Sequence, residues 1–324
     1  MALAAAAAVL AWALAGGGSG RHAGVASGGR PAAARPAAAA LHVAVTQAGR
    51  LPAAVQDAAA AALPGGNALL IGGLDRADAS STDVLQIDGA GARRTGALPT
   101  ALHDACASAV AGGVYVFGGG QLTSYSQILR VPAGTGAAQP AGSLPTPASD
   151  VACATVGGGA YIIGGYTGSE ALRTIVSWRP GAAPAVVGEL PKPLRYAAVA
   201  QLGGQILIAG GTSGAEASRD VYRFDPGSGA VRRLASLPRP VTHAAGAALG
   251  GSLLVIGGRG AATNSQTREI LAVSPGGAVS VAGTLPLGLS DLAAIQARGS
   301  LLLAGGRDSA GNPQSTILTV TLRR

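Results

Sequence analysis

Short apolar runs that end in a pair of glycines recur six times along the chain. The second glycine of each pair comes 46 to 48 residues after the previous one, at Gly73, Gly119, Gly165, Gly211, Gly258 and Gly306. A Leu-Pro pair recurs at the same interval, with its leucine at Leu51, Leu98, Leu144, Leu190, Leu237 and Leu285. Two markers that share one period indicate a structural repeat, and a period of this size is typical of propellers and solenoids.

The polar and apolar positions inside one repeat predict four short strands. In the fourth repeat, the apolar segment 196–202 is followed by a glycine pair suited to a tight turn and then by a strand at 205–209. After a polar loop, 220–224 alternates as a half-buried strand does, and 230–236 is the last strand of the repeat. Four antiparallel strands in each repeat, without a helical period, describe a propeller blade. We therefore predict an all-β, six-bladed β-propeller.

The two ends of the repeat region complement each other. The last repeat stops after its third strand, at 316–322, whereas an extra strand at 42–45 precedes the first Leu-Pro pair. We expect this N-terminal strand to become the outermost strand of the last blade. Such a closure would fasten the ring and leave no open sheet edge between the first and last blades.

The glycine doublets, the polar loops after them and the length of the period resemble the Kelch repeat, and the resemblance covers residues 41–324. Kelch repeats usually carry a tyrosine and a tryptophan at set distances after the doublet. Here Tyr222 and Trp178 hint at these positions, both in third strands, so the repeats are degenerate and aliphatic packing is expected to replace aromatic packing. The chain is also similar to exported Kelch-repeat proteins of GC-rich actinobacteria.

The residues before the repeats differ from them in composition. Residues 1–15 form an apolar run of signal-peptide length, with small residues suited to cleavage at its end, and are too short to span a bilayer. An Ala-rich disordered leader is the alternative interpretation. Residues 16–40 cannot bury enough apolar surface to fold, so we predict a disordered linker before a propeller at 41–324. The mature chain is expected to be exported, extracellular or at the cell envelope, without a membrane span.

The two cysteines occupy equivalent segments of neighbouring repeats. Cys106 comes eight residues after its Leu-Pro leucine and Cys153 comes nine after its own, which places them on opposite faces of their strands. We therefore expect two small buried thiols and no disulfide.

Several kinds of chemistry lack the residues that they need. His and Cys at zinc-ligand spacing are absent, as are a phosphate-binding glycine loop before a helix and a G-x-S-x-G motif. The chain is basic, with 23 Lys and Arg against 15 Asp and Glu, but no basic run interleaved with aromatics accompanies this charge. We predict no metal, no cofactor and no nucleic-acid partner, and we expect a monomer.

The candidate binding site is the mouth of the central channel, where the loops that lead into each first strand would emerge. The residue six places after each repeated leucine begins the innermost strand: Asp57, Asp104, Asp150, Tyr196, His243 and Asp291. Four aspartates at one repeat position suggest a structural rule, because Asp at a strand start can accept hydrogen bonds from loop N–H groups. A carboxylate-lined ligand site is the other interpretation.

Residues that differ from their equivalents in the other repeats are the stronger site candidates. His103, Arg195, Tyr196 and His243 break the symmetry of the mouth, as the contacts of an asymmetric ligand would. The loops between second and third strands add arginines that follow glycine doublets closely, namely Arg76, Arg259 and Arg307.

Three functions fit these features. The first is a non-catalytic scaffold at the cell envelope that binds a protein or glycan at the mouth. The second, suggested by the resemblance to bacterial six-bladed Kelch proteins, is a sugar mutarotase or epimerase, with Asp104 or Asp150 as base, His243 as acid and Arg195 as carboxylate clamp. The third is a structural partner in an envelope assembly, with an inert channel.

Overall fold

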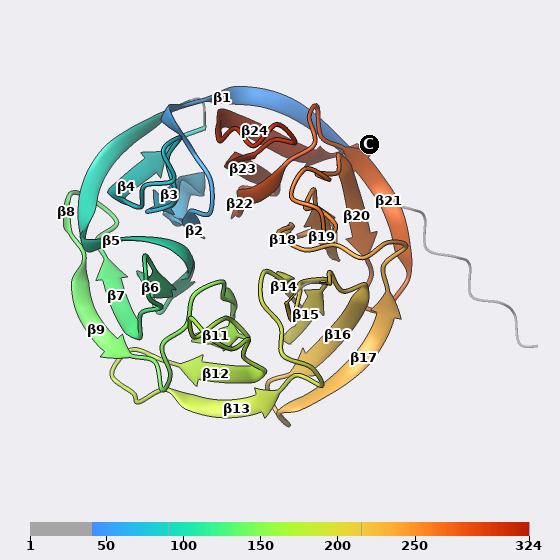
Figure 1. Cartoon of the computed structure of the whole chain (residues 1–324), viewed down its shortest axis with the longest axis horizontal. Coiled ribbons are helices and arrows are strands. Elements are labelled where there is room, and N and C mark those ends of the chain that lie inside the picture. Colours follow the sequence, from blue (N-terminus) through green and yellow to red (C-terminus); the bar gives the residue numbers. More distant parts are fainter. Residues whose placement is uncertain (1–40, 90, 215, 324) are drawn as a thin grey trace, which may run out of the picture. The chain divides into compact units, whose positions relative to one another are not determined.

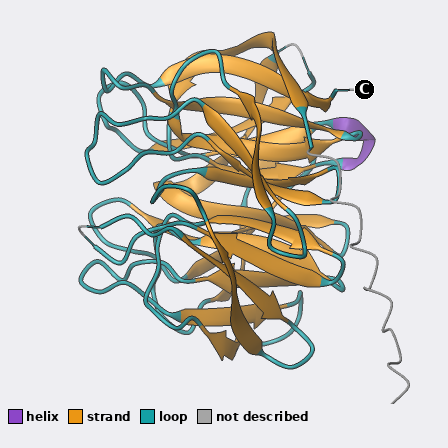
Figure 2. Cartoon of the chain, turned by 90° about the vertical axis from the view of Figure 1, so that its right-hand side faces the viewer, coloured by secondary structure: helices purple, strands orange, loops and turns teal. Residues whose placement is uncertain are grey.

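The computed structural model describes residues 41–89, 91–214 and 216–323, which are built almost wholly of β-strands. The strands are arranged in a ring around a central axis (Figure 1). Figure 2 shows the long loops on one side of the strands, and on the other side the short turns and a 3-10 helix, η1 (Pro64–Gly66). The all-β prediction is confirmed, whereas the signal-peptide-like segment 1–15 and the linker 16–40 lie outside the described residues.

Three sheets have four antiparallel strands that follow one another outward from the axis in chain order (Figure 1). Their strands are β10 (Ala152–Val156), β11 (Gly159–Ile163), β12 (Thr174–Trp178) and β13 (Ala185–Glu189); β14 (Ala198–Leu202), β15 (Gln205–Ala209), β16 (Asp220–Asp225) and β17 (Ala230–Ser236); and β18 (Ala245–Leu249), β19 (Ser252–Ile256), β20 (Glu269–Val273) and β21 (Val279–Thr284). Each sheet is one sequence repeat and is called a blade below.

A fourth four-stranded sheet joins the two ends of the repeat region. It consists of β22 (Ser290–Ala297), β23 (Ser300–Arg307), β24 (Gln314–Leu322) and, outermost, β1 (Val43–Val55). The pairing of β1 with β24 begins with Val43 opposite Leu322 and continues to Arg50 opposite Thr316. The predicted closure of the ring by the N-terminal strand is confirmed.

The remaining strands form one sheet of eight. They are β2 (Ala59–Ala62), β3 (Ala68–Ile71), β4 (Ser81–Ile87), β5 (Ala92–Val110), β6 (Gly113–Gly120), β7 (Gln127–Val131), β8 (Gly136–Ala137) and β9 (Gln139–Ser143). The long strand β5 pairs with β4 as far as Leu102 and with β6 from His103 onward. One continuous strand therefore serves as the outer strand of the first repeat and the inner strand of the second.

The glycine doublets mark places where the next connection crosses the end of the second strand. Gly118 and Gly119 both have positive φ, of 65° and 80°. A side chain on Gly118 would put its Cβ 2.0 Å from the Ala148 carbonyl oxygen, which accepts a hydrogen bond from the Gly119 N–H. Only glycine combines this backbone conformation with such a close approach, so the doublet recurs with the repeat.

The core lies between the sheets rather than within one repeat. Trp178 of β12 is buried, and its ring makes edge contacts with Tyr115 and Phe117 of β6, with centroids 4.7 and 5.4 Å away. Most other contact regions are aliphatic, as the composition predicts; between β18–β21 and β22–β24 the buried cluster is made entirely of Ala, Val, Leu and Ile.

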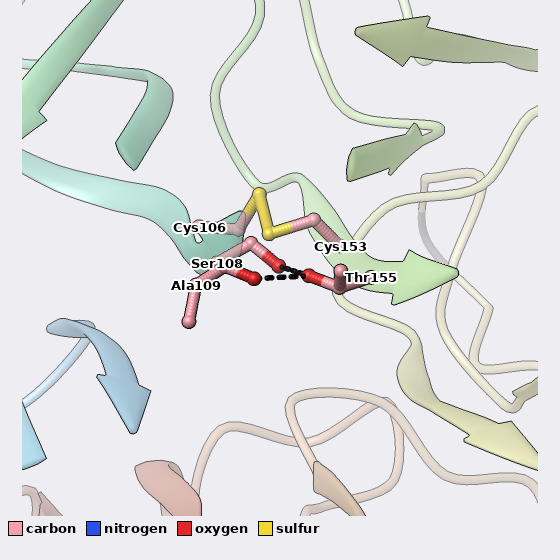
Figure 3. Close-up of a disulfide and its surroundings, with 5 residues drawn as sticks. All are labelled: Cys106, Ser108, Ala109, Cys153 and Thr155. Carbon is pink, nitrogen blue, oxygen red and sulfur yellow. Dashed lines mark hydrogen bonds between the residues drawn. A yellow bond between two sulfur atoms is a disulfide. The ribbon is translucent and has the colours of Figure 1, made fainter. Parts of the chain in front are cut away.

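Cys106 and Cys153 form a disulfide, with Cα atoms 5.9 Å apart (Figure 3), so the expectation of two free thiols is wrong. Cys106 lies on β5 and Cys153 on β10, the inner strands of neighbouring repeats. In a ring, the forward face of one blade meets the backward face of the next. Side chains on opposite faces of equivalent strands therefore point toward each other, and the one-residue offset is what allows the bond.

Beside the disulfide, two hydroxyl side chains link the same strands. Thr155 donates a hydrogen bond to the Ala109 carbonyl oxygen at 3.0 Å, and its hydroxyl also lies 2.5 Å from that of Ser108 (Figure 3). Covalent and hydrogen-bonded contacts thus join the inner strands of the second and third repeats.

Candidate functional site

Six residues at one repeat position surround the central mouth. They start the innermost strands, and all have left-handed φ values between 54° and 58°: Asp57, Asp104, Asp150, Tyr196, His243 and Asp291. Aspartate is among the non-glycine residues that tolerate this region best, because its short polar side chain can bond locally. The backbone conformation therefore explains why aspartate recurs here.

The main chains of these six residues form a closed ring of hydrogen bonds. Each N–H donates to the carbonyl oxygen of the equivalent residue one repeat earlier, over 2.7 to 3.3 Å, and Asp57 completes the circle by donating to Asp291. We call them the mouth ring. Among the described residues, no loop N–H donates to these carboxylates, contrary to the structural interpretation; Asp104, Asp150 and Asp291 contact the side chains of Tyr196, Arg195 and Ser290 instead.

The mouth ring lines a hollow of about 120 Å³ together with the residues that follow it. Burial raises the pKa of Asp57 well above its ordinary value, and the charges of Asp291 and Asp104 raise it further. Burial and the charges of Asp150 and Asp291 likewise raise the pKa of Asp104. Burial and mutual repulsion thus favour the protonated form of these carboxyls.

Arg195 organises one side of the mouth. Its Nε lies 2.6 Å from the carboxylate of Asp150, and its guanidinium lies over the rings of Tyr166 and Tyr196, 4.2 and 4.8 Å from their centroids. The Tyr196 hydroxyl donates to Asp104 at 3.1 Å. Burial by itself lowers the pKa of Arg195, but Asp150, Tyr196 and Asp104 together outweigh it and the net pKa is raised, so this arginine stays charged.

His243 is held as a neutral imidazole. Its ring stacks on Tyr196, with centroids 3.7 Å apart. Nε2 accepts a hydrogen bond from Arg259 at 3.2 Å, which leaves the proton on Nδ1, 3.0 Å from the Thr242 hydroxyl. Burial, then the charges of Arg259 and Arg195, lowers the pKa of His243 to about 3.

The other predicted site residues divide into two groups. His103 lies at the mouth, with Nδ1 2.9 Å from the Ser80 hydroxyl and Nε2 3.6 Å from Asp104, and burial lowers its pKa. Arg307 is close enough for its charge to oppose the burial that raises the pKa of Asp291. Arg76, by contrast, is exposed and lines a separate hollow with Pro52.

Tyr166 is the mouth residue that the sequence analysis missed. It follows the glycine doublet of the third repeat directly, in the position that Arg259 and Arg307 occupy in the fifth and sixth repeats. This equivalent position after the glycine doublet is the sequence signal that identifies Tyr166. Among the described residues, no group of three or more His, Cys, Asp and Glu side chains is arranged to hold a metal ion.

The radial sheets and the mouth ring define the class of the protein, a β-propeller with a central mouth. Residues 193–238, which contain β14 to β17, match the Kelch motif. Among solved structures, one titled "Structure of YjhT" has a TM-score of 0.73 and 17% sequence identity, over 85% of this chain and 99% of that chain. At this identity the likeness establishes a Kelch-like propeller fold. A comparison with the curated proteins found no match.

Proposed function

We propose that the chain is a six-bladed Kelch-type propeller that acts as a non-catalytic binding scaffold, with its ligand at the mouth ring. The eight-stranded sheet supports the blade count, because β5 can be divided between two blades where its pairing changes from β4 to β6. The six-membered ring of main-chain hydrogen bonds supports it independently.

The observation that carries the binding function is the cluster of Arg195, Tyr196, His243 and Arg259 on one side of the mouth. Tyr196 and His243 stand where other repeats have aspartate, and Arg195 and Arg259 lie beside them. Together they present donors, acceptors and aromatic faces, which are held in place by stacking and hydrogen bonds. A ligand rich in hydroxyl groups matches such mixed polarity. The hollow of about 120 Å³ is below the ~300 Å³ of a typical small-molecule pocket, so it would admit an end group of a glycan rather than a whole sugar.

The same contacts argue against acid–base catalysis by His243. Both ring nitrogens are occupied, and with a pKa of about 3 the ring is not an imidazolium at neutral pH, so it cannot act as a general acid there. Asp150 is engaged by Arg195 and is therefore a poor free base. A mutarotase-like enzyme remains the second candidate, because the raised pKa of Asp104 would keep a proton available for ring opening of a sugar.

A binding screen with Arg195→Ala tests the proposal. The full chain is titrated with neutral sugars, sugar acids and oligosaccharides, and affinity is read by calorimetry and thermal shift. Loss of a charged hydrogen-bonding group should weaken a mouth ligand by about tenfold or more. Arg232→Ala, on the exposed outer strand β17, is the matched control and should bind as the original chain does.

Each outcome of the screen decides between the candidates. A ligand that binds equally to Arg195→Ala and the original chain contradicts the mouth site. NMR can measure whether the protein speeds up the interconversion of sugar anomers. Acceleration by the original chain that is lost in Asp104→Asn would favour the enzyme. Failure of every carbohydrate to bind would favour a protein partner, to be sought by capture on the intact chain.

We also propose that the protein is exported and that it is a monomer at the cell envelope or outside the cell. The Cys106–Cys153 disulfide supports this location, because structural disulfides persist in oxidising compartments. No helix in the described part of the chain is long and apolar enough to cross a membrane. Thiol labelling of protein taken directly from its native cells should find both cysteines blocked, and free thiols would contradict export.

A further inference from the structure

A second cavity, of about 760 Å³, lies beside the mouth between the fourth and fifth repeats. Its floor is apolar and consists of the buried side chains of Val241, Val255 and Leu271. Its rim is formed by the loop that follows β15, the connection from β17 to β18 and the loop that follows β19. This volume falls within the ~300–1,000 Å³ typical of small-molecule sites.

The equivalent groove in the third repeat is almost filled. There the space measures about 30 Å³ and is lined by Leu172 and Ile162. Leu172 corresponds to Thr267, because the N–H of each donates to the second glycine of its doublet, Gly165 or Gly258. The third repeat thus has a leucine that packs into the core between blades where the fifth has threonine, and Ile162 where the fifth has the smaller Val255. The loop is also two residues longer in the fifth repeat.

The rim of the cavity carries more positive than negative charge. Arg239, Arg259 and Arg268 line it with two acidic residues, and Arg239 is paired with Glu269 at 2.5 Å. The ion pairs between described residues include neither Arg259 nor Arg268. Arg268 donates to the Leu285 carbonyl oxygen at 2.8 Å, and Arg259 contacts His243 and two loop carbonyls, all of them neutral.

The third repeat again provides the contrast. Arg173 is the equivalent of Arg268, since the carbonyl oxygen of each accepts a hydrogen bond from the leucine of the next Leu-Pro pair. Arg173 forms an ion pair with Glu189 at 3.2 Å. In the fifth repeat an arginine at the same position keeps its charge available beside an open, apolar cavity.

We propose that this cavity is a second binding site, for a small organic anion: a carboxylate, sulfonate or phosphate ester on an apolar body. The apolar part would cover Val241, Val255 and Leu271, and the anionic group would meet Arg268 and Arg259 at the rim. Burial of apolar surface supplies the affinity, and guanidinium groups select the anion because their paired N–H donors match two oxygen atoms. The cavity adjoins the mouth and shares Arg259 with the mouth cluster, but neither Thr267 nor Arg268 lines the mouth, so both can be changed without touching the mouth ring.

Fluorescence of 8-anilinonaphthalene-1-sulfonate with the folded full chain tests the proposal. This probe carries two aromatic ring systems and one sulfonate, and it should bind saturably at one site. Thr267→Leu introduces the residue that fills the equivalent space in the third repeat, and it should weaken probe binding at least tenfold. Arg268→Met keeps the cavity open. It should lower the affinity for the sulfonate probe about tenfold and leave the affinity for the uncharged N-phenyl-1-naphthylamine unchanged.

Arg173→Met is the matched control and should leave the affinity for both probes unchanged. Melting curves for every variant establish that the probe reports the cavity and not partial unfolding. Two results would overturn the inference: probe binding that does not saturate at one equivalent, or binding that persists unchanged in Thr267→Leu. Equal effects of Arg268→Met on the charged and uncharged probes would overturn the anion preference and with it the proposed ligand class.

Discussion

At the scale of single residues, the centre of the molecule is governed by one backbone conformation. Six residues adopt φ near 55°, a region that costs a non-glycine residue about 1–2 kcal/mol. Four of them are aspartates, which tolerate this conformation but crowd their carboxyls into a small buried hollow. Tyr196 and His243 are exceptions that are held by stacking on each other. Backbone requirements and charge repulsion therefore oppose each other in the mouth ring.

Asp57→Asn should separate these two effects. The pKa of Asp57 is raised in the folded chain, so the unfolded chain releases this proton at lower pH. Stability should therefore fall as pH rises above about 4 and stay reduced beyond the folded-state pKa. Asparagine also tolerates left-handed φ and cannot ionise. We expect the variant to melt at a higher temperature than the original chain near pH 8, with the difference shrinking toward pH 4.

The control for this comparison is Asp88→Asn, at an exposed turn away from the ring. The melting temperature of this variant should equal that of the original chain at every pH. If the melting temperature of Asp57→Asn changed with pH in parallel with that of the original chain, ionisation of Asp57 would not be what lowers the stability of the folded chain.

At the scale of secondary-structure elements, β1 supplies the contact that closes the ring. Val43 is 2% exposed and packs in the cluster between β18–β21 and β22–β24. Residues Val43 to Arg50 cover the edge of β24, which otherwise would present unpaired backbone groups. Pairing of the N-terminal strand with the last hairpin also means that the repeat region becomes complete only when both chain ends are in place.

Deletion of residues 43–50 from the full chain should therefore destabilise it and promote self-association. Burial of a valine such as Val43 contributes about 1.5–3 kcal/mol by itself, and eight strand residues are lost in total. We expect a lower melting temperature and a sedimentation coefficient that rises with concentration. The double variant Thr46→Ala/Gln47→Ala changes exposed side chains of the same strand and should remain monomeric. An equally stable, monomeric deletion variant would contradict the closure argument.

At the scale of the whole molecule, two kinds of contact hold the repeats together. Around the axis, main-chain hydrogen bonds pass from one repeat to the next through the mouth ring. Farther out, side chains interlock between sheets, as Trp178 does with Tyr115 and Phe117. The open cavity beside Thr267 interrupts this packing between the fourth and fifth repeats.

The fold could be predicted from the sequence because its markers depend on contacts that recur in every repeat. The glycine doublet is required wherever a connection crosses the second strand, and the aspartate position is required by left-handed φ, so both appear with the repeat period. The same periodicity brings His243 and Arg259 to the mouth, whereas Arg76, which follows another glycine doublet, lines a different hollow because its own loop turns away. Whether the mouth residues bind a ligand stays a prediction.

Contacts between different repeats could not be read from the chain, because no periodic pattern specifies which side chains meet. The Cys106–Cys153 bond, the contact of Arg195 with Tyr166 and the stacking of Tyr196 on His243 each depend on how one blade faces the next. Repeat number, strand order and ring closure are thus determined by the sequence itself. The disulfide, the charge state of the mouth and the open cavity are decided by tertiary structure, since burial and neighbours exist only after the blades have packed.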